Sequence, residues 1–367
     1  MLFAATSCAA DDPVEAIGSG ESTTGGQTTA DPEPGTAEAS TTTDASHEGS
    51  AAADTHADGA DEESTGTPIE PELEPPYPIV LTHGFFGFND FAGAGFVDYY
   101  WKLVDHLADD GELLVFTPAV DPFNDSTYRG EQLIAHVEEI LASTGYPKVN
   151  LIGHSQGGLD ARVVASLRPD LVASVTTIAT PHQGTRIADI VLGLASSSST
   201  QAIADALVQL IGAPLWDEVG EETSVVKSLE QLSEAGMAVF NEAYPDSPGV
   251  LYFSITGRTA LHLGGNACQV AGSPPFITDF ASTRDPVDPL LALTETVLSG
   301  YNPFALIPND GLVVVDSAKW GTFLGCIPAD HLDEVGHLFG TSPGLFNDWK
   351  YLAFYADLVA FLRTHGV

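Results

Sequence analysis

The sequence predicts an α/β fold in which helices cover both faces of a mostly parallel central sheet. From residue 77 onward, short β-branched and apolar segments alternate regularly with amphipathic helical segments, which is the pattern of right-handed βαβ units. One unit, residues 148–167, carries a glycine-flanked serine on the turn between its strand and its helix. A Gly-rich turn also follows the first apolar segment, at the end of a strand, where the sites of open α/β sheets collect.

The composition divides the chain of 367 residues at about residue 76. Residues 1–8, MLFAATSC, resemble the end of a signal peptide or a lipoprotein box, with Cys8 as the residue that would carry a lipid anchor, and we expect the true start upstream. Residues 9–76 are rich in Ala, Asp, Glu, Gly, Ser, Thr and Pro, which predicts a disordered acidic tether. Residues 77–367 form the folded domain. These features predict a protein that is secreted or tethered to the outer cell surface.

Charge is unevenly distributed along the chain. Acidic residues outnumber basic ones 51 to 12, and residues 1–76 hold 17 of the acids and no Lys or Arg. The domain therefore keeps 34 acids against 12 bases. Such a surface excludes nucleic acid as a partner and would expel an anionic product such as a fatty acid, although adaptation to a saline habitat explains it equally well. No run of 18 apolar residues occurs, so we expect no transmembrane segment.

The elements of the domain follow in order. A buried strand, a Gly-rich turn, a helix, a strand and a second helix are expected at 79–82, 83–87, 101–107, 113–116 and 131–141. The strand, turn and helix of 148–167 come next, and a buried strand at 172–179 ends in TPHQG. Residues 187–215 combine apolar clusters with four consecutive serines and few charges, which favours a helical lid over the site; a subunit contact is the alternative.

Ser155 is the candidate nucleophile. It lies in Gly153-His154-Ser155-Gln156-Gly157, the G-x-S-x-G pattern of a strand-to-helix elbow, in which only glycine fits two residues to either side. The bare pattern is weak, and an ordinary structural turn is the alternative. The buried strand before it and the helix after it favour the catalytic interpretation. In α/β hydrolases the elbow is accompanied by two backbone oxyanion donors, here expected at Phe85 and Gln156.

The acid and the base should follow the serine in that order. Asp310 is the best acid candidate because Asn309-Asp310-Gly311 forms a turn just before an apolar run. The histidines after Asp310 are His331, His337 and His365, and the order of residues alone does not choose among them. An earlier histidine, His182 in TPHQG, is expected to be a loop residue beside the elbow rather than the base.

The domain resembles the secreted bacterial true lipases of the Pseudomonas and Burkholderia type. The resemblance rests on PIVLTHGFFGF, RGEQLIAHVEEILASTGYPKVNLIGHSQGG, RPDLVASVTTIATPHQG, NDGLV and HLDEV, and covers nearly all of residues 77–367. It implies an α/β-hydrolase fold with Ser155 as nucleophile, Asp310 as acid and His331 as base, and with oxyanion donors at Phe85 and Gln156. It also implies an acylglycerol substrate at a lipid–water interface and, as a further expectation, a dedicated foldase as partner.

The resemblance implies one structural Ca²⁺ near the catalytic histidine. Its ligands would be the carboxylates of Asp285 and Asp333 and the backbone carbonyls of His337 and Thr341. Oxygen-only ligation suits this hard cation. From spacing alone, Asp285 and Asp333 could equally be surface acids of an acidic protein.

Two cysteines lie in the domain, Cys268 and Cys326. In a chain with secretory features they suggest one disulfide, and two unpaired buried thiols are the alternative. Their positions differ from those in the family, so the family disulfide does not transfer directly.

The leading hypothesis is a carboxylic ester hydrolase, a triacylglycerol lipase that acts on long-chain acylglycerols through a Ser-Asp-His triad and an acyl-enzyme intermediate. An esterase or phospholipase of the same fold is the alternative within this chemistry. A surface-tethered binding protein on an inactive hydrolase scaffold is the alternative of another class.

Overall fold

The computed structural model describes residues 73–85, 99–193, 224–259, 265–300, 302, 305–336, 340, 343–344 and 346–367. All of them belong to one compact unit, Thr67–Val367. The predicted leader and most of the predicted tether, residues 1–72, lie outside the described residues, as do residues 194–215 of the predicted lid.

A six-stranded sheet forms the centre of this unit, and every pair of neighbouring strands runs parallel. The strand order is β2-β1-β3-β4-β5-β6. Their bounds are β1 Ile79–Thr82, β2 Val115–Phe116, β3 Val149–His154, β4 Val172–Ile178, β5 Leu251–Gly257 and β6 Thr322–Ile327. The predicted parallel α/β fold is confirmed.

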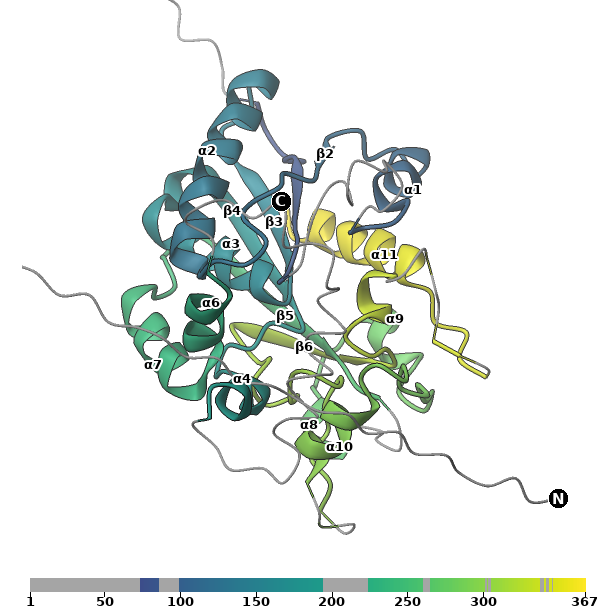
Figure 1. Cartoon of the computed structure of the whole chain (residues 1–367). Coiled ribbons are helices and arrows are strands. Elements are labelled where there is room, and N and C mark those ends of the chain that lie inside the picture. The colour runs from purple at the N-terminus through teal and green to yellow at the C-terminus, as the bar shows by residue number, and fades with distance from the viewer. Residues whose placement is uncertain are drawn as a thin grey trace, which may run out of the picture. The chain divides into compact units, whose positions relative to one another are not determined.

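Helices cover both faces of the sheet (Figure 1). On one face lie α2 (Ser126–Thr144) and α3 (Gln156–Leu167); on the other lie α1 (Leu103–Asp109) and α11 (Tyr351–Thr364). The remaining described helices are α4 Arg186–Val191, α6 Val225–Leu232, α7 Glu234–Ala243, α8 Gly265–Cys268, α9 Pro275–Thr278 and α10 Ala292–Ser299, with short 3₁₀ turns at Pro169–Leu171 and Asp333–Val335.

The core is split into two layers by the alternation of strand side chains. Ile79 and Leu81 of β1 point into the layer beneath α1 and α11, whereas Val80 between them points into the layer beneath α2 and α3. This is the period-2 alternation of a strand that is buried on both faces. All four residues of β1 are buried, which explains why its sequence reads as a continuous apolar run.

Several predicted elements differ in their bounds from the observed ones; the helix expected at 101–107, for example, is α1 at Leu103–Asp109. The helix expected at 131–141 begins at Ser126, because the Asp125 side chain accepts hydrogen bonds from Thr127 N (2.9 Å) and Tyr128 N (3.1 Å) and so caps the helix earlier. It ends before Gly145, which adopts a left-handed φ of 77°. The strand expected at 113–116 keeps only Val115 and Phe116, and Leu113 is exposed.

Candidate active site

Ser155 occupies a strained turn between β3 and α3. Its φ of 54° is positive, which is unfavourable for a residue with a side chain. A Cβ on Gly153 would lie 2.5 Å from the carbonyl oxygen of Gly157, and one on Gly157 would lie 2.3 Å from that of Thr82. The two flanking glycines are therefore required by the packing of α3 against β1 and β3, and the predicted strand, turn and helix are all present.

His331 and Asp310 are hydrogen-bonded to each other. His331 Nδ1 lies 2.9 Å from Asp310 Oδ2, and both side chains are buried. Because a carboxylate only accepts, Nδ1 carries the proton and Nε2 is left as the proton acceptor. The imidazole lies against the nucleophile turn, since its ring centroid is 4.6 Å from that of His154, the residue before Ser155.

The structure distinguishes among the three histidines that the sequence left open. Of these, His331 is bonded to Asp310, whereas His365 packs on Phe361 at the C-terminus and its Nδ1 lies near the Phe361 carbonyl oxygen. His337 lies outside the described residues. His182 is buried, stacks on Trp320 and has its Nε2 3.0 Å from Thr177 Oγ1. Burial and the neighbouring Arg162 guanidinium hold the pKa of His182 well below its usual value, so it is a packed, neutral residue.

The turn after β1 lies against Ser155. A Cβ on Gly84 would lie 2.7 Å from the Ser155 Cβ, so the predicted oxyanion residue Phe85 follows directly on this contact. The fully buried Arg129 of α2 donates to the His83 carbonyl oxygen at 2.7 Å. It also pairs at 2.7 Å with Asp160 of α3, which is equally buried. One guanidinium thus holds the turn after β1 against α3.

His83 is a second support of this turn. Burial, together with the Arg129 charge, lowers its pKa to about 3, so the ring is neutral. Its Nε2 accepts the backbone N–H of Val120 at 3.1 Å, which leaves Nδ1 to donate to the Gly84 carbonyl oxygen at 2.9 Å. The sequence predicted the Gly-rich turn at 83–87 and the donor Phe85 within it, but it did not reveal Arg129 or Asp160.

Glu334 and His154 form a buried polar pair behind His331, and the sequence analysis missed it. His154 Nε2 lies 2.9 Å from Glu334 Oε2, and its Nδ1 lies 2.6 Å from the Tyr99 hydroxyl. Burial, followed by the nearby Asp310 and Asp330 charges, raises the pKa of Glu334 well above its usual value. Nothing near His154 in the sequence marks it as one of a pair, because its partner Glu334 is 180 residues further along the chain.

Three carboxylates, those of Asp285, Asp330 and Asp333, converge beside the histidine loop, with one oxygen of each within 4.8 Å of the others. Asp330 binds backbone N–H groups of Asp288, Leu332 and Asp333. Neither carboxylate oxygen of the buried Asp285 makes a hydrogen bond of ordinary geometry among the described residues, although the Thr259 hydroxyl and the Asp330 N–H lie close enough to act against the rise of its pKa. Burial, then the Asp330 charge, raises the pKa values of Asp285 and Asp333 to about 8.

This cluster fits a hard cation. It offers only oxygen donors, and a buried carboxylate without partners is costly unless a cation or proton neutralises it. The structure brings the predicted Asp285 and Asp333 together and adds Asp330, which the sequence analysis did not select. The predicted carbonyl ligands His337 and Thr341 lie outside the described residues.

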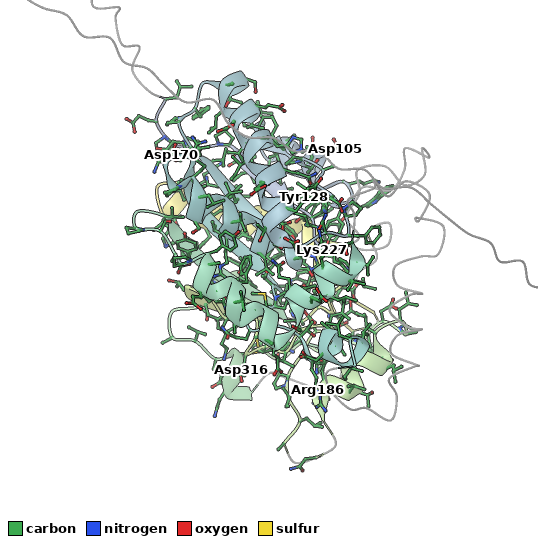
Figure 2. The ribbon with its side chains drawn as sticks, turned by 60° about the vertical axis from the view of Figure 1, so that its left-hand side comes forward. Asp105, Tyr128, Asp170, Arg186, Lys227 and Asp316 are labelled. Atoms are coloured by element: carbon green, nitrogen blue, oxygen red, sulfur yellow. A yellow bond between two sulfur atoms is a disulfide. The ribbon has the colours of Figure 1, made fainter. Side chains whose placement is uncertain are left out.

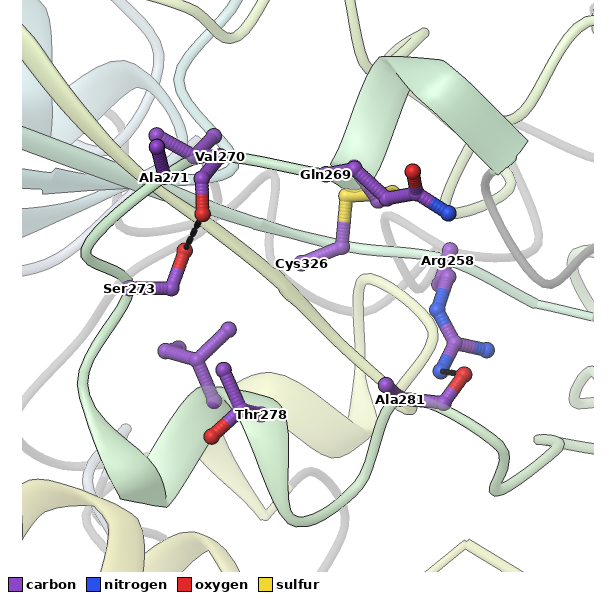
Figure 3. A pocket seen from close by; sticks show the side chains of 10 residues that line it. Arg258, Gln269, Val270, Ala271, Ser273, Thr278, Ala281 and Cys326 are labelled. Atoms are coloured by element: carbon purple, nitrogen blue, oxygen red, sulfur yellow. Dashed lines mark hydrogen bonds between the residues drawn. A yellow bond between two sulfur atoms is a disulfide. The ribbon is translucent and has the colours of Figure 1, made fainter.

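Cys268 of α8 and Cys326 of β6 form a disulfide with a Cα–Cα distance of 5.2 Å, as predicted. A cavity of about 340 Å³ adjoins it (Figure 3), and its lining residues include Arg258, Val270 and Ile277 but none of the three predicted triad residues. Arg258 donates to the backbone carbonyls of Phe280, Ala281 and Thr283. Its role is therefore to hold this loop in place rather than to take part in catalysis.

The described part of the predicted lid is packed into the domain. Ile187 and Ile190 of α4 are buried against Val297 and Leu298 of α10. Among the described residues, no helix combines the length and the hydropathy needed to cross a membrane.

The parallel sheet, the strained serine turn and the Asp-His pair define an α/β hydrolase of the serine type. Residues 77–219 match the alpha/beta hydrolase fold family. The chain is 39% identical over 304 residues to a triacylglycerol lipase of Vibrio cholerae, covering 79% of this chain and 86% of the relative. It is 34% identical over 317 residues to that of Burkholderia plantarii (79% and 84% covered) and 29% identical over 269 residues to that of Pseudomonas fragi (71% and 88% covered).

The chain belongs to the triacylglycerol lipase family, and the protein is a hydrolase. The resemblance to the Pseudomonas and Burkholderia enzymes is thereby confirmed. A solved structure of similar fold is the mature lipase BlEst2 of Bacillus licheniformis, with a TM-score of 0.51 and 19% identity over 82% of this chain and 97% of that one.

Proposed function

We propose that the protein hydrolyses long-chain acylglycerols with Ser155 as nucleophile, His331 as base and Asp310 as acid. The observation that carries the proposal is the hydrogen bond between His331 and Asp310 beside the strained Ser155 turn. The names of the relatives, triacylglycerol lipases of Vibrio, Burkholderia and Pseudomonas, support the choice of substrate class.

In this mechanism Ser155 Oγ attacks the ester carbonyl carbon while His331 Nε2 accepts the hydroxyl proton. The backbone N–H groups of Phe85 and Gln156 donate to the oxyanion, and each such donor typically contributes about 10²–10³-fold in rate. His331 then returns the proton to the departing alcohol. Water, deprotonated by the same imidazole, attacks the acyl-enzyme and releases the fatty acid.

The test of this assignment is Ser155→Ala assayed on an emulsified triglyceride. Activity should fall to background, because alanine has no hydroxyl with which to attack the ester. Ser143→Ala, which removes an exposed hydroxyl on α2, is the control and should retain full activity. Hydrolysis by Ser155→Ala would overturn the assignment.

Two further experiments separate the alternatives. Labelling of the wild-type protein by a fluorophosphonate separates an active enzyme from a binding protein on an inactive scaffold. A panel of acyl lengths and headgroups separates a lipase from an esterase or phospholipase.

We also propose that Asp285 and Asp333, with the carbonyls of His337 and Thr341, hold one Ca²⁺. The ion would neutralise the buried carboxylates and tie the loop that carries His331 to the segment that carries Asp285. Support comes from the buried oxygens of Asp285, which make no hydrogen bond of ordinary geometry to a described residue, and from the convergence of three acids.

Secretion, with or without a lipid anchor at Cys8, remains a further proposal. The disulfide supports it, because disulfides persist mainly in oxidising compartments. Refolding of the purified, denatured protein without additions would test whether a foldase is required: recovery of activity would remove that partner.

A further inference from the structure

The side chain of Gln156 is fixed at both ends in the interior. Gln156 is fully buried. Its Nε2 donates to the carbonyl oxygen of Asn124 at 2.8 Å, and its Oε1 accepts a hydrogen bond from Ser228 Oγ at 3.1 Å. The residue whose backbone N–H is the proposed oxyanion donor is therefore anchored to two other parts of the molecule, the turn before α2 and the helix α6.

Helix α6 is hydrogen-bonded to the start of α2 and to the residue before α4. Gln231 of α6 accepts the backbone N–H of Ser126 at 2.7 Å, and the carbonyl oxygen of Leu232 accepts that of Thr185 at 2.9 Å. Figure 2 shows α6 beside the start of α2, where Lys227 and Tyr128 are labelled close together. Because α6 and the start of α2 are hydrogen-bonded to each other, the two anchors of the Gln156 side chain are connected.

The backbone on either side of the Ser155 turn is bonded to its neighbours, because the Ser155 N–H donates to the Ile178 carbonyl oxygen at 2.8 Å and the Ser155 carbonyl oxygen accepts from Thr180 Oγ1 at 2.7 Å. The Gln156 side chain adds a further anchor on the other side of the same peptide unit. Ser155 is the residue before α3, yet its hydroxyl makes no capping hydrogen bond, since that hydroxyl is needed as nucleophile. The next two residues after Gln156 are glycines and have no side chains with which to fix the turn. Among residues 155–158, all of which the structure describes, Gln156 supplies the side-chain hydrogen bonds to other elements.

We propose that Ser228 and the Gln156 side chain act as positioning residues that orient the Gln156 backbone N–H toward the oxyanion. This inference rests on the proposed oxyanion role of Gln156. An oxyanion donor is effective only when it is held in the geometry of the transition state, within about 0.5 Å. Ser228 does not touch substrate, and its effect passes through the Gln156 side chain.

Ser228→Ala should weaken catalysis without weakening substrate binding. The substitution leaves Gln156 Oε1 buried without its donor, so the side chain can rotate and the N–H is less well aimed. We expect kcat on a soluble short-chain ester to fall about 3–10-fold at unchanged KM, and the inhibition constant of an alkyl boronic acid, which forms a tetrahedral adduct, to rise by the same factor. If Ser228 had only a structural role, Ser228→Ala would lower the thermal midpoint but leave kcat and the inhibition constant of the boronic acid unchanged.

Ser224→Ala is the matched control. It removes the hydroxyl that caps the same helix, where Ser224 Oγ accepts the N–H of Lys227. The hydrogen bonds of the Gln156 side chain go to Asn124 and Ser228 and not to Ser224. This variant should lose stability but keep the wild-type kcat and boronic acid affinity.

A double-mutant cycle decides whether Ser228 acts through Gln156. Gln156→Met keeps the length of the side chain and removes both hydrogen bonds, so kcat should fall. In that background, adding Ser228→Ala should cause no further loss. An equal loss in both backgrounds, or unchanged kcat in Ser228→Ala alone, overturns the inference. Failure of the proposed function looks different, because the wild-type protein would then neither hydrolyse the ester nor bind the boronic acid.

Discussion

Asp310 is held in place independently of its bond to His331. Its Oδ1 accepts the backbone N–H groups of Leu312 at 2.8 Å and Val313 at 2.7 Å, and its carbonyl oxygen accepts that of His331 at 2.9 Å. The other carboxylate oxygen is therefore free to bind Nδ1 alone. Because one oxygen binds the backbone and the other binds His331, a mutation can remove the charge of Asp310 without changing its position.

Asp310→Asn should remove the charge with little change in structure. The amide oxygen can keep the two backbone hydrogen bonds, so the NH₂ group must face His331 Nδ1 and force the ring into the wrong tautomer. We expect kcat to fall about 10⁴-fold, with a thermal midpoint close to that of the wild type. Steady-state kinetics and calorimetry check the two parts; a fall of less than 10-fold would show that Asp310 is not the acid.

The buried pair of Arg129 and Asp160 leads to a prediction on stability. Arg129→Met leaves Asp160 buried without its charged partner, so unfolding should become easier by about 3–5 kcal/mol. Adding Asp160→Asn removes the stranded charge and should recover part of that loss. Urea unfolding of both variants measures it. If Asp160→Asn instead lowers the free energy of unfolding further, by as much as it does in the wild type, then the unpaired Asp160 charge is not the main cost of Arg129→Met.

Residues whose role depends on their neighbours in the chain can be recognised from the sequence, whereas residues whose partners are distant in the chain cannot. Ser155 was identified because its two glycines are neighbours in the chain. His154 and Glu334 could not be paired in advance, since nothing local marks a contact across 180 residues. The Gln156 side chain was equally hidden, because its hydroxyl partner Ser228 looks like any polar residue of an amphipathic helix.

At the scale of elements, the packing of α3 against β1 fixes the nucleophile turn. The carbonyl oxygens of Thr82 and His83 lie within 2.6 Å of where a Gly157 Cβ would be. The Thr82 hydroxyl also donates to the Gly157 carbonyl oxygen at 2.8 Å. The close approach brings the oxyanion turn, which follows β1, within reach of the first turn of α3.

Gly157→Ala should separate these two elements. The added methyl group meets backbone rather than a flexible side chain, so strand and helix must move apart, and both activity and stability should fall sharply. Gly249→Ala is the control, because its Cβ would meet nothing within 4 Å and only its positive φ of 87° disfavours a side chain; it should cost about 1–2 kcal/mol and no activity. A Gly157→Ala enzyme with wild-type kcat and thermal midpoint would contradict this account.

The alternation of strands and helices was predictable from the sequence, and the ends of the elements were less so. Helix α2 begins at Ser126, five residues before the predicted start at residue 131, because the Asp125 side chain caps it. Leu113 is apolar but exposed, which is why β2 is shorter than its apolar run. In both cases a single side chain, rather than the average of the segment, sets the boundary.

At the scale of the whole molecule, acidic residues from two separate segments meet beside the histidine loop. Asp285 precedes α10, whereas Asp330 and Asp333 flank His331. Without a cation, Asp285 and Asp333 have pKa values of about 8, because burial and mutual repulsion disfavour the charged forms. In the unfolded chain their pKa values would be close to 4.

This difference predicts how calcium and pH together set stability. Between pH 4 and pH 8 the folded, metal-free protein holds protons that the unfolded chain has released, so its stability should fall as pH rises through this range. Ca²⁺ displaces those protons, and its affinity should therefore increase with pH. The gap between the thermal midpoints in Ca²⁺ and in EGTA should be small at pH 5 and widen to about 5–10 °C at pH 8.

Two variants sharpen the measurement. Asp333→Asn should abolish the gap at every pH and lower activity, because the cation loses a ligand and the loop that carries His331 is no longer tied down. Asp316→Asn changes an exposed acid paired with Lys319 and should keep the wild-type gap. A gap of the same size at pH 5 and pH 8 in the wild type would show that Asp285 and Asp333 do not bind the ion. If activity and the thermal midpoint are unchanged after exhaustive chelation, calcium has no role in the mechanism. Bound protons alone would then neutralise the three acids.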